Sequence, residues 1–382
     1  MTTAQQLRTR LPQTAFAFRG YNVTNLGRTA ELLAHPVYGT VVGRYLARAS
    51  AVCSSVLGRR VDLVRRVEEG RESTLDTFGE DIGLIMSVEL AQVELLRDYF
   101  GLDYTACRVG LGYSLGEVTA LCASGVYQME DVLLPLVTLA PDCAALARDI
   151  TMGVVFSRGV ELDLDRVRHL CLEINLQGRG VIAISSHLSP NTVLVLGQQD
   201  TVDRFKRRMG EVVGGHANLR KNRDRWPPLH TPILWERHVP NRAGMMMHTV
   251  PGGMQPPDPP VLSLVTGDAG YTAYNSRDIL HRWLDNHQRL WEVINELLQG
   301  GINLVLHVGP DPNLLPATFK RLSDNVRLQL AGGTLNSLGL RAVSGLARRA
   351  WLAKLLSAKA ALLRAPFVEH VIVEDWLLAQ RV

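Results

Sequence analysis

Apolar residues in the first 150 positions follow two patterns: long segments in which they recur every three or four positions, and short continuous runs. The first pattern predicts helices and the second predicts buried strands, because side chains repeat with a period near 3.6 in a helix and alternate in a strand. The short runs are 14–18 and 106–110, and the periodic segments are 28–34, 37–57, 81–100, 118–122 and 131–147. Strands separated by long helices indicate an α/β fold.

The order of the patterns changes after residue 150. A strand, a helix, two strands, a second helix and one further possible strand follow one another, which is a βαββαβ order. These segments are 152–156, 162–172, 181–185, 192–196, 201–213 and 216–219. The order is typical of a ferredoxin-like unit, so we expect residues 150–221 to form a small subdomain inserted into a larger one.

The last third of the chain returns to mixed strands and helices. A helix is expected from Pro232, and the five prolines within 251–260 predict a loop. Strands are predicted at 261–265, 303–308 and 326–330, and helices at 276–285 and 291–298. Basic and apolar residues alternate at helical spacing through 340–363, so we expect 332–382 to be a C-terminal helical extension packed on the body. The large unit would then comprise 1–149 and 222–331.

Composition narrows the class of protein. A chain of 382 residues with 46% hydrophobic content can bury a large core, divided into two or three domains or subdomains. No stretch resembles a membrane span, and residues 1–12 lack the apolar core of a signal peptide. The five cysteines are scattered without CxxC spacing, as expected for reduced thiols of a cytoplasmic protein. A net charge of +4 is too small and dispersed to indicate nucleic-acid binding.

The most informative motif joins the strand at 106–110 to the helix at 118–122. It places Ser114 two residues from Gly112 and two from Gly116, which predicts a nucleophile elbow, because only small flanking residues tolerate so sharp a strand-to-helix turn. Such a turn holds the serine Oγ clear of the backbone, and the N–H of Leu115 becomes an oxyanion donor. A plain glycine-containing turn with a solvated serine is the alternative.

A serine elbow requires a base, and two histidines qualify. The chain order of an ordinary α/β-hydrolase would nominate His307 with an upstream acid such as Asp268. His307, however, lies inside an apolar strand pattern, where a histidine is more often structural. His230 lies instead at a loop-to-helix junction, 227–234, from which an imidazole can project into a cleft.

Several separate motifs together resemble the malonyl-CoA:acyl carrier protein transacylase family, which includes acyltransferase domains of fatty-acid and polyketide synthases. Residues 112–117, Gly-Tyr-Ser-Leu-Gly-Glu, resemble the family's Gly-His-Ser-X-Gly-Glu elbow. Residues 229–234, Leu-His-Thr-Pro-Ile-Leu, resemble its Phe-His-Ser-Pro-Leu-Met segment, which holds the catalytic histidine. Residues 18–21, 35–38 and 308–310 match further landmarks in order, so the similarity covers about 14–330. It implies an α/β-hydrolase-like large domain with an inserted ferredoxin-like small domain.

The resemblance also implies a mechanism, which is ping-pong acyl transfer. His230 would take the proton of Ser114, which attacks an acyl-CoA thioester while the amides of Leu115 and Tyr21 hold the oxyanion. The phosphopantetheine thiol of an acyl carrier protein would then accept the acyl group. No metal and no permanently bound cofactor are implied. A backbone carbonyl near 310–313 is expected to orient the histidine.

The sequence departs from the family pattern around the acyl pocket. Members that load malonyl or methylmalonyl groups carry an arginine on the helix after the elbow, but this chain has none between Arg108 and Arg148. The expected place is occupied by 137–140, Val-Thr-Leu-Ala, of which Leu139 is the expected pocket residue. An unpaired buried carboxylate costs several kcal/mol, so we expect an uncharged acyl group: acetyl, a longer chain, or a carrier-bound acyl group that is removed by hydrolysis. Alternatively, Arg19 compensates and malonyl is used. Further expected pocket residues that differ from the family are Tyr113, Asp81, Ser186 and His187.

Three classes of function stay open at this point. The protein could be an acyl-CoA:acyl carrier protein acyltransferase, an acyl hydrolase that clears carrier proteins, or a non-catalytic paralogue that only docks a carrier. Retention of both Ser114 and His230 favours the enzymes. Basic residues cluster between 206 and 225, and either they form a solvated face or some of them meet the acidic carrier protein, which charge reversal at Arg207 and Arg208 would test.

Overall fold

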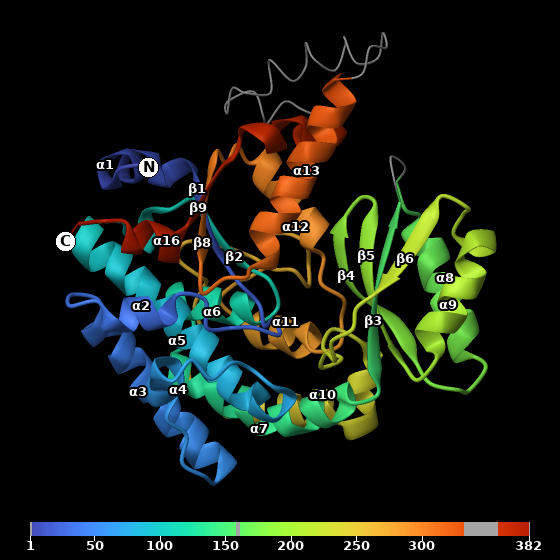
Figure 1. Ribbon diagram of the computed structural model, residues 1–382, viewed down its shortest axis with the longest axis horizontal. Helices are drawn as coiled ribbons and strands as arrows, with labels where there is room; N and C mark the ends of the chain where they lie inside the picture. Colours follow the sequence, from blue (N-terminus) through green and yellow to red (C-terminus); the bar gives the residue numbers. More distant parts are fainter. Residues whose placement is uncertain (1, 158–160, 332–357, 382) are drawn as a thin grey trace.

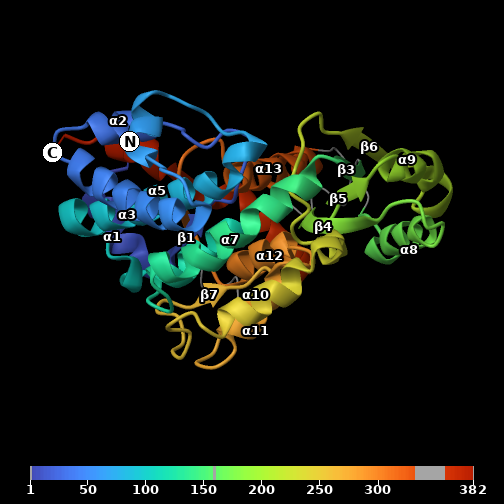
Figure 2. The same cartoon turned by 90° about the horizontal axis from the view of Figure 1, so that it is seen from below.

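The computed structural model describes residues 2–157, 161–331 and 358–381. These residues form two units, each built around its own β-sheet (Figure 1). The larger unit contains both ends of the described chain, and the smaller one extends from it on one side (Figure 2).

The large unit is built on five parallel strands in the order β7-β2-β1-β8-β9. In that order the strands are Val261–Leu262, Val109–Gly112, Thr14–Phe18, Leu304–Val308 and Glu369–Ile372. The central strand β1 is buried on both faces, as a parallel sheet covered by helices requires. Phe16 and Phe18 point into the core on one face, and Ala15 and Ala17 into the core on the other. Because the strands are parallel, the segments that follow β1 and β2 meet at one edge of the sheet.

Helices cover both faces of this sheet (Figures 1 and 2). Those that share a core with Phe16 and Phe18 are α1 (Ala4–Arg10), α2 (Thr29–Ala34), α3 (Gly39–Leu57), α4 (Leu63–Glu68), α5 (Phe78–Phe100), α6 (Leu115–Ala123), α7 (Met129–Ala147), α10 (Val239–Met247), α11 (Ser276–Trp283) and α16 (Val373–Leu378). Those on the other face are α12 (Leu290–Gln299), α13 (Leu314–Ala331) and α15 (Ala358–Ala361). Short 3₁₀ helices are η1 (Leu11–Gln13), η2 (Leu75–Thr77), η3 (Tyr104–Ala106), η4 (Pro232–Arg237) and η6 (Leu362–Phe367).

The small unit has the predicted βαββαβ order. Its elements are β3 (Ile150–Ser157), α8 (Leu164–Asn175), β4 (Ile182–Ser189), β5 (Thr192–Gln198), α9 (Thr201–Val212) and β6 (Ala217–Lys221). The antiparallel strands lie in the order β4-β5-β3-β6, which is ferredoxin-like. Helices α8 and α9 cover one face, and the opposite face turns toward α12 and α13 of the large unit (Figure 1). Leu188 and Leu194 on that opposite face belong to the same core as α12.

Two predictions near the C-terminal end were wrong. Residues 326–330 belong to helix α13 and not to a strand, because the buried side chains continue at helical spacing from Leu315 through Phe319, Leu322 and Val326. Within the expected helical extension, the described residues include strand β9, which pairs in parallel with β8. The helix predicted for 340–363 falls mostly outside the described residues.

Among the residues that the structure describes, no helix is both long and apolar enough to traverse a bilayer. The same residues contain no group of three or more His, Cys, Asp or Glu side chains placed to hold a metal ion. All five cysteines are free thiols, and burial raises the pKa of the Cys53 and Cys171 thiols to about 12.

Candidate active site

The loop between β2 and α6 is a tight elbow with Ser114 at its apex. Ser114 has a φ of 53°, a region that non-glycine residues rarely adopt, and it directly precedes the first residue of α6. A Cβ atom at Gly112 would lie 1.9 Å from the carbonyl carbon of Gly116, and one at Gly116 would lie 2.4 Å from the carbonyl oxygen of Phe18. Both glycines are therefore required by close backbone contacts, as the motif predicted.

The elbow serine meets the histidine that the sequence motif nominated. Ser114 Oγ lies 2.7 Å from His230 Nε2, although 116 residues separate them along the chain. His230 also has a positive φ, 64°, and its backbone N–H donates to the carbonyl of Leu284 at 2.6 Å. The two strained backbones thus bring a hydroxyl and an imidazole into hydrogen-bonding contact.

The carbonyl that orients the imidazole comes from Trp283 and not from 310–313, so that prediction was wrong. His230 Nδ1 donates to the Trp283 carbonyl at 2.7 Å, which leaves Nε2 free to accept the serine proton. The Trp283 indole also donates from Nε1 to the Ser114 carbonyl at 3.1 Å, and its ring contacts the His230 ring edge to face. The carbonyl of Pro310 instead accepts from the Arg19 guanidinium. Sequence reasoning could not find Trp283, because any residue supplies a backbone carbonyl.

The pH dependence of nucleophile activation follows from the burial of His230. Burial lowers the pKa of His230 from 6.5 to about 4, with the backbone bond to Trp283 opposing the shift. Only the neutral ring can accept a proton, so we expect the rate of Ser114 acylation to stay level from about pH 8 to about pH 5 and to fall below that. Intact-mass measurement of acyl-enzyme formation across this range tests it. An acidic limb at pH 6.5, the ordinary value for histidine, would contradict this assignment.

The loop after β1 lies directly over the elbow. A Cβ atom at Gly20 would come within 2.6 Å of the Tyr113 carbonyl oxygen and 3.3 Å of Ser114 Cβ. The next residue, Tyr21, packs its ring edge to face against Phe78. Leu115 opens α6, so its N–H belongs to the first turn of that helix. Of the two expected oxyanion residues, Leu115 therefore directly follows Ser114, and Tyr21 directly follows the glycine that lies over Ser114.

Arg19 is fully buried, and its guanidinium group forms hydrogen bonds with the loop that follows β1. Its Nε donates to the Gly20 carbonyl at 2.8 Å, and its Nη2 donates to Asn25 Oδ1 at 2.6 Å and to the Thr24 carbonyl at 3.3 Å. Its Nη1 donates to the Pro310 carbonyl. A substrate carboxylate could pair with Arg19 only after these bonds broke. The contacts therefore favour a role in holding the loop over pairing with an acyl group.

The remaining predicted pocket residues occupy several different places. Asp81 forms an ion pair with buried Arg66 at 2.5 Å, and burial raises the pKa of the Asp81 carboxyl to about 6. Tyr113 packs against the core shared by α12 and the open face of the small sheet, and burial raises its pKa to about 12. Ser186 and His187 lie on β4, where Ser186 Oγ donates to the Gln288 carbonyl at 3.2 Å and His187 Nδ1 lies 3.2 Å from Glu292 Oε2.

An apolar cavity of about 30 Å³ lies beside Trp283 and Leu284, whose backbone carbonyls accept hydrogen bonds from His230. Leu139 on α7 and Val118 on α6 line it, together with Trp283, the residue that contacts both Ser114 and His230. Pro135 and Met247 complete much of the wall. Leu139 belongs to the segment 137–140, where the resemblance predicted an arginine in malonyl-loading members, and no charged residue lines this cavity.

The ordinary hydrolase alternative is not supported by the placement of its residues. His307 lies within β8, is buried, and approaches His370 of β9, with 2.9 Å between His307 Nε2 and His370 Nδ1. Asp268 contributes its backbone carbonyl to a turn with Ser263. The described contacts therefore leave His230 as the histidine paired with Ser114.

Together, the doubly covered parallel sheet, the elbow serine and the buried histidine form the arrangement that a serine nucleophile requires. No protein-family model matches the chain. Two curated relatives are polyketide synthases: a non-reducing one from Aspergillus terreus, 32% identical over 103 residues, and GfsA of Streptomyces halstedii, 24% identical over 302 residues. These alignments cover 26% and 78% of this chain, which spans about 4% of the length of either relative.

Solved structures define the fold more closely. The malonyl-CoA:acyl carrier protein transacylase of Xanthomonas oryzae matches with a TM-score of 0.67 at 24% identity, over 82% of this chain and 92% of that one. FabD from Acinetobacter baumannii matches with a TM-score of 0.66 at 22% identity, over 81% and 91%. A malonyl-transacylase in complex with a type II polyketide synthase acyl-carrier protein matches with a TM-score of 0.63 at 21% identity, over 80% and 92%. The chain has the fold of these transacylases, as the sequence resemblance predicted.

Proposed function

We propose that the protein is an acyltransferase that moves an acyl group from coenzyme A to an acyl carrier protein through an acyl-serine. The observation that carries the proposal is the 2.7 Å contact between Ser114 Oγ and His230 Nε2 on a strained elbow. A strained serine that contacts an oriented, neutral imidazole is the arrangement required for a serine nucleophile. The fold shared with malonyl-CoA:acyl carrier protein transacylases supports the substrate class.

The proposed reaction has two half-reactions that use the same pair. Ser114 Oγ attacks the thioester carbonyl of acyl-CoA and passes its proton to His230 Nε2, while the N–H groups of Leu115 and Tyr21 stabilise the oxyanion. His230 returns that proton to the departing thiolate of coenzyme A. The phosphopantetheine thiol of the carrier then gives its proton to His230 and attacks the acyl-serine, and the proton returns to Ser114 as the ester breaks.

The apolar cavity supports an uncharged, short acyl group as the substrate. None of its lining residues can pair with a carboxylate, and its volume is close to the ~30 Å³ that one water molecule occupies in the liquid. A malonyl carboxylate placed there would lose its hydration without gaining a cation, at a cost of several kcal/mol. We therefore propose acetyl or a similarly small uncharged group in preference to malonyl.

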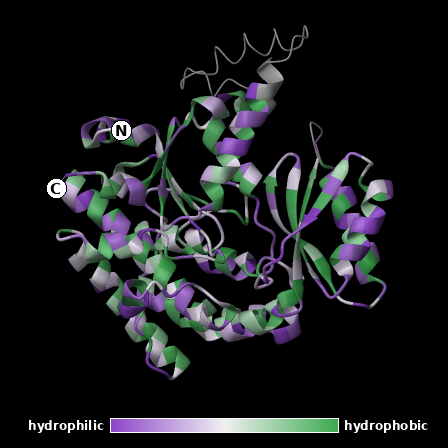
Figure 3. Cartoon of the chain, viewed as in Figure 1, coloured by the Kyte–Doolittle hydropathy of each residue, from purple (hydrophilic) through white to green (hydrophobic). Residues whose placement is uncertain are grey.

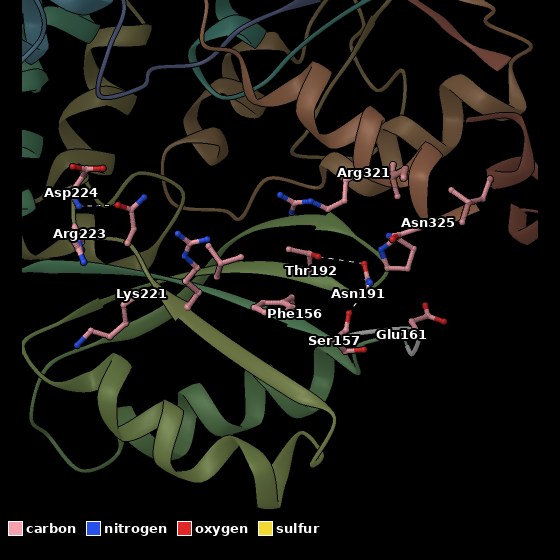
Figure 4. A pocket seen from close by; sticks show the side chains of 16 residues that line it. Phe156, Ser157, Glu161, Asn191, Thr192, Lys221, Arg223, Asp224, Arg321 and Asn325 are labelled. Atoms are coloured by element: carbon pink, nitrogen blue, oxygen red, sulfur yellow. Dashed lines mark hydrogen bonds between the residues drawn. The ribbon is translucent and has the colours of Figure 1, made fainter. Parts of the chain in front are cut away.

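A second, much larger cavity of about 1320 Å³ separates the open face of the small sheet from α13 (Figure 4). Arg220 lines it from β6, Arg223 from the segment that follows β6, and Arg321 from α13. Among the described residues, none of these three guanidinium groups forms an ion pair. The acidic residues Glu161 and Asp224 also line the cavity. We propose that these arginines attract the acidic carrier protein, because complementary charge raises association rates.

Only part of the basic cluster at 206–225 lines this cavity. Arg207 and Arg208 are on α9, which covers the face of the small sheet opposite the cavity (Figure 1), and Arg208 is paired with Glu173.

A double variant, Arg223→Glu with Arg321→Glu, should therefore slow acyl transfer from preformed acyl-enzyme to holo carrier by about tenfold at low ionic strength, and less at high salt. Arg207→Glu is the matched control. Equal effects of the two changes would exclude the cavity as the docking side.

The proposed function is tested by exposing the purified protein to a mixture of acyl-CoA esters, with and without holo carrier protein, and measuring intact masses. A mass increase on the protein, moved to the carrier when the carrier is added, is the expected result. Free acid released at the same rate without a carrier would indicate a hydrolase. Absence of any acyl-enzyme would indicate a carrier-docking paralogue without activity.

A further inference from the structure

Gln288 is a fully buried residue that joins the nucleophile to the small unit. It lies between α11 and α12, and its side-chain Oε1 accepts a hydrogen bond from the Ser114 backbone N–H at 3.2 Å. Its backbone N–H donates to the Ser185 carbonyl at 2.9 Å, and its backbone carbonyl accepts from the His187 N–H at 2.8 Å. These last two contacts form a short parallel bridge to β4.

The orientation of the Gln288 amide is fixed by the group it meets. The Ser114 N–H is a donor, so only the side-chain oxygen can face it, and Nε2 must point away. Nε2 is buried and has no hydrogen-bond partner among the described residues. A buried amide without a partner typically costs about 1–3 kcal/mol. The folded protein therefore bears this cost as long as Gln288 Oε1 accepts the hydrogen bond from the Ser114 backbone N–H.

The same stretch of β4 also reaches the histidine side of the site. Ser185 Oγ donates to the Leu229 carbonyl at 3.2 Å, and Leu229 directly precedes His230. One continuous set of hydrogen bonds thus runs from the Ser114 N–H through Gln288 and Ser185 to the residue before His230. Ser114 and His230 belong to the large unit, but hydrogen bonds connect Ser114, through Gln288, and the residue before His230 to a strand of the small unit.

We propose that Gln288 is a positioning residue for the proposed acyl transfer: its side-chain oxygen holds the Ser114 backbone in the strained conformation, and its backbone ties the nucleophile to β4. The inference rests on the proposed function. It assigns Gln288 no contact with substrate and no proton transfer. Its role is to keep Ser114 Oγ within reach of His230, which a small displacement would disturb.

The test compares two substitutions of nearly the same size. Gln288→Leu removes both the acceptor that serves Ser114 and the unpartnered donor, so we expect thermal stability to change little while Ser114 acylation slows about 10- to 100-fold, with KM for acyl-CoA unchanged. Gln288→Glu keeps an acceptor, so we expect it to restore most of the acylation rate. A buried carboxyl near the pair should also shift the acidic limb of the pH profile to higher pH.

The readouts are stopped-flow acylation by acyl-CoA, labelling of Ser114 by a fluorophosphonate, and the melting temperature. Gln380→Leu, near the C-terminal end, is the matched control. Wild-type rates in Gln288→Leu, or equal rate losses in both Gln288 variants together with a large fall in melting temperature, would overturn the inference. If the wild-type protein reacts with the fluorophosphonate but with no acyl-CoA, the proposed function fails while the labelling rates still decide the role of Gln288.

Discussion

Replacing Ser114 with alanine is expected to abolish acyl-enzyme formation. The serine Oγ is the only group that the described contacts place on His230 Nε2, so no other side chain there can form the ester. In serine hydrolases the loss of the nucleophile lowers kcat on the order of 10⁶-fold, which is below detection in an intact-mass experiment. The measurement is the mass of the protein after brief exposure to acyl-CoA, followed by peptide mapping of the modified residue.

Two further variants make this result specific. His230→Ala should slow acylation by a comparable factor, because the hydroxyl then lacks its base, whereas His238→Ala, eight residues later, should leave the rate near that of wild type. Circular dichroism of each variant shows whether the fold is intact. An acyl adduct that persists in Ser114→Ala, mapped to another residue, would refute the assignment of the nucleophile.

The α/β architecture could be predicted because its elements carry strong local patterns. The βαββαβ order of the small unit and the strands at β1 and β8 follow from apolar runs bounded by helical segments. Strand β9 carried no comparable signal, since all four of its residues are only half-buried and two of them are Glu369 and His370. Its position depends on pairing with β8 across the intervening residues 309–368, which no local pattern encodes.

The residues of the candidate site also divide into those that carry a sequence signal and those that do not. Ser114 was found because a sharp turn requires glycines at fixed distances. His230 was nominated by its place at a loop-to-helix junction and chosen because 229–234 resemble the histidine segment of the transacylase family. Trp283 and Gln288 were missed because their contributions depend on where the fold places them and not on a sequence motif. Trp283 contributes its backbone carbonyl, and Gln288 contributes a buried side-chain amide. Arg19 was assigned to the pocket from proximity in sequence, but its guanidinium is bound by four acceptors of the protein itself.

The choice of acyl group is expected to depend on Leu139. With equimolar acetyl-CoA and malonyl-CoA in competition, we expect acetyl-Ser114 to form at least about 10²-fold faster, because 1.4 kcal/mol corresponds to tenfold and an unpaired buried carboxylate costs several times that. Leu139→Arg places a guanidinium beside Trp283 and should raise the malonyl share while lowering the acetyl rate, since Arg can bind a carboxylate bidentately. The masses of the two adducts report the ratio directly.

Size and charge must be separated, because arginine is larger than the leucine it replaces and the cavity is small. Leu139→Met conserves volume without adding charge, so it should keep the acetyl preference and change stability by less than about 1.5 kcal/mol. Faster formation of malonyl-Ser114 than of acetyl-Ser114 by the wild-type protein would refute the uncharged-acyl proposal, independently of the results for the variants. Arg19 would then have to release its backbone partners to meet the carboxylate, and Arg19→Lys, which lacks the planar fork, should lose malonyl selectivity in that case only.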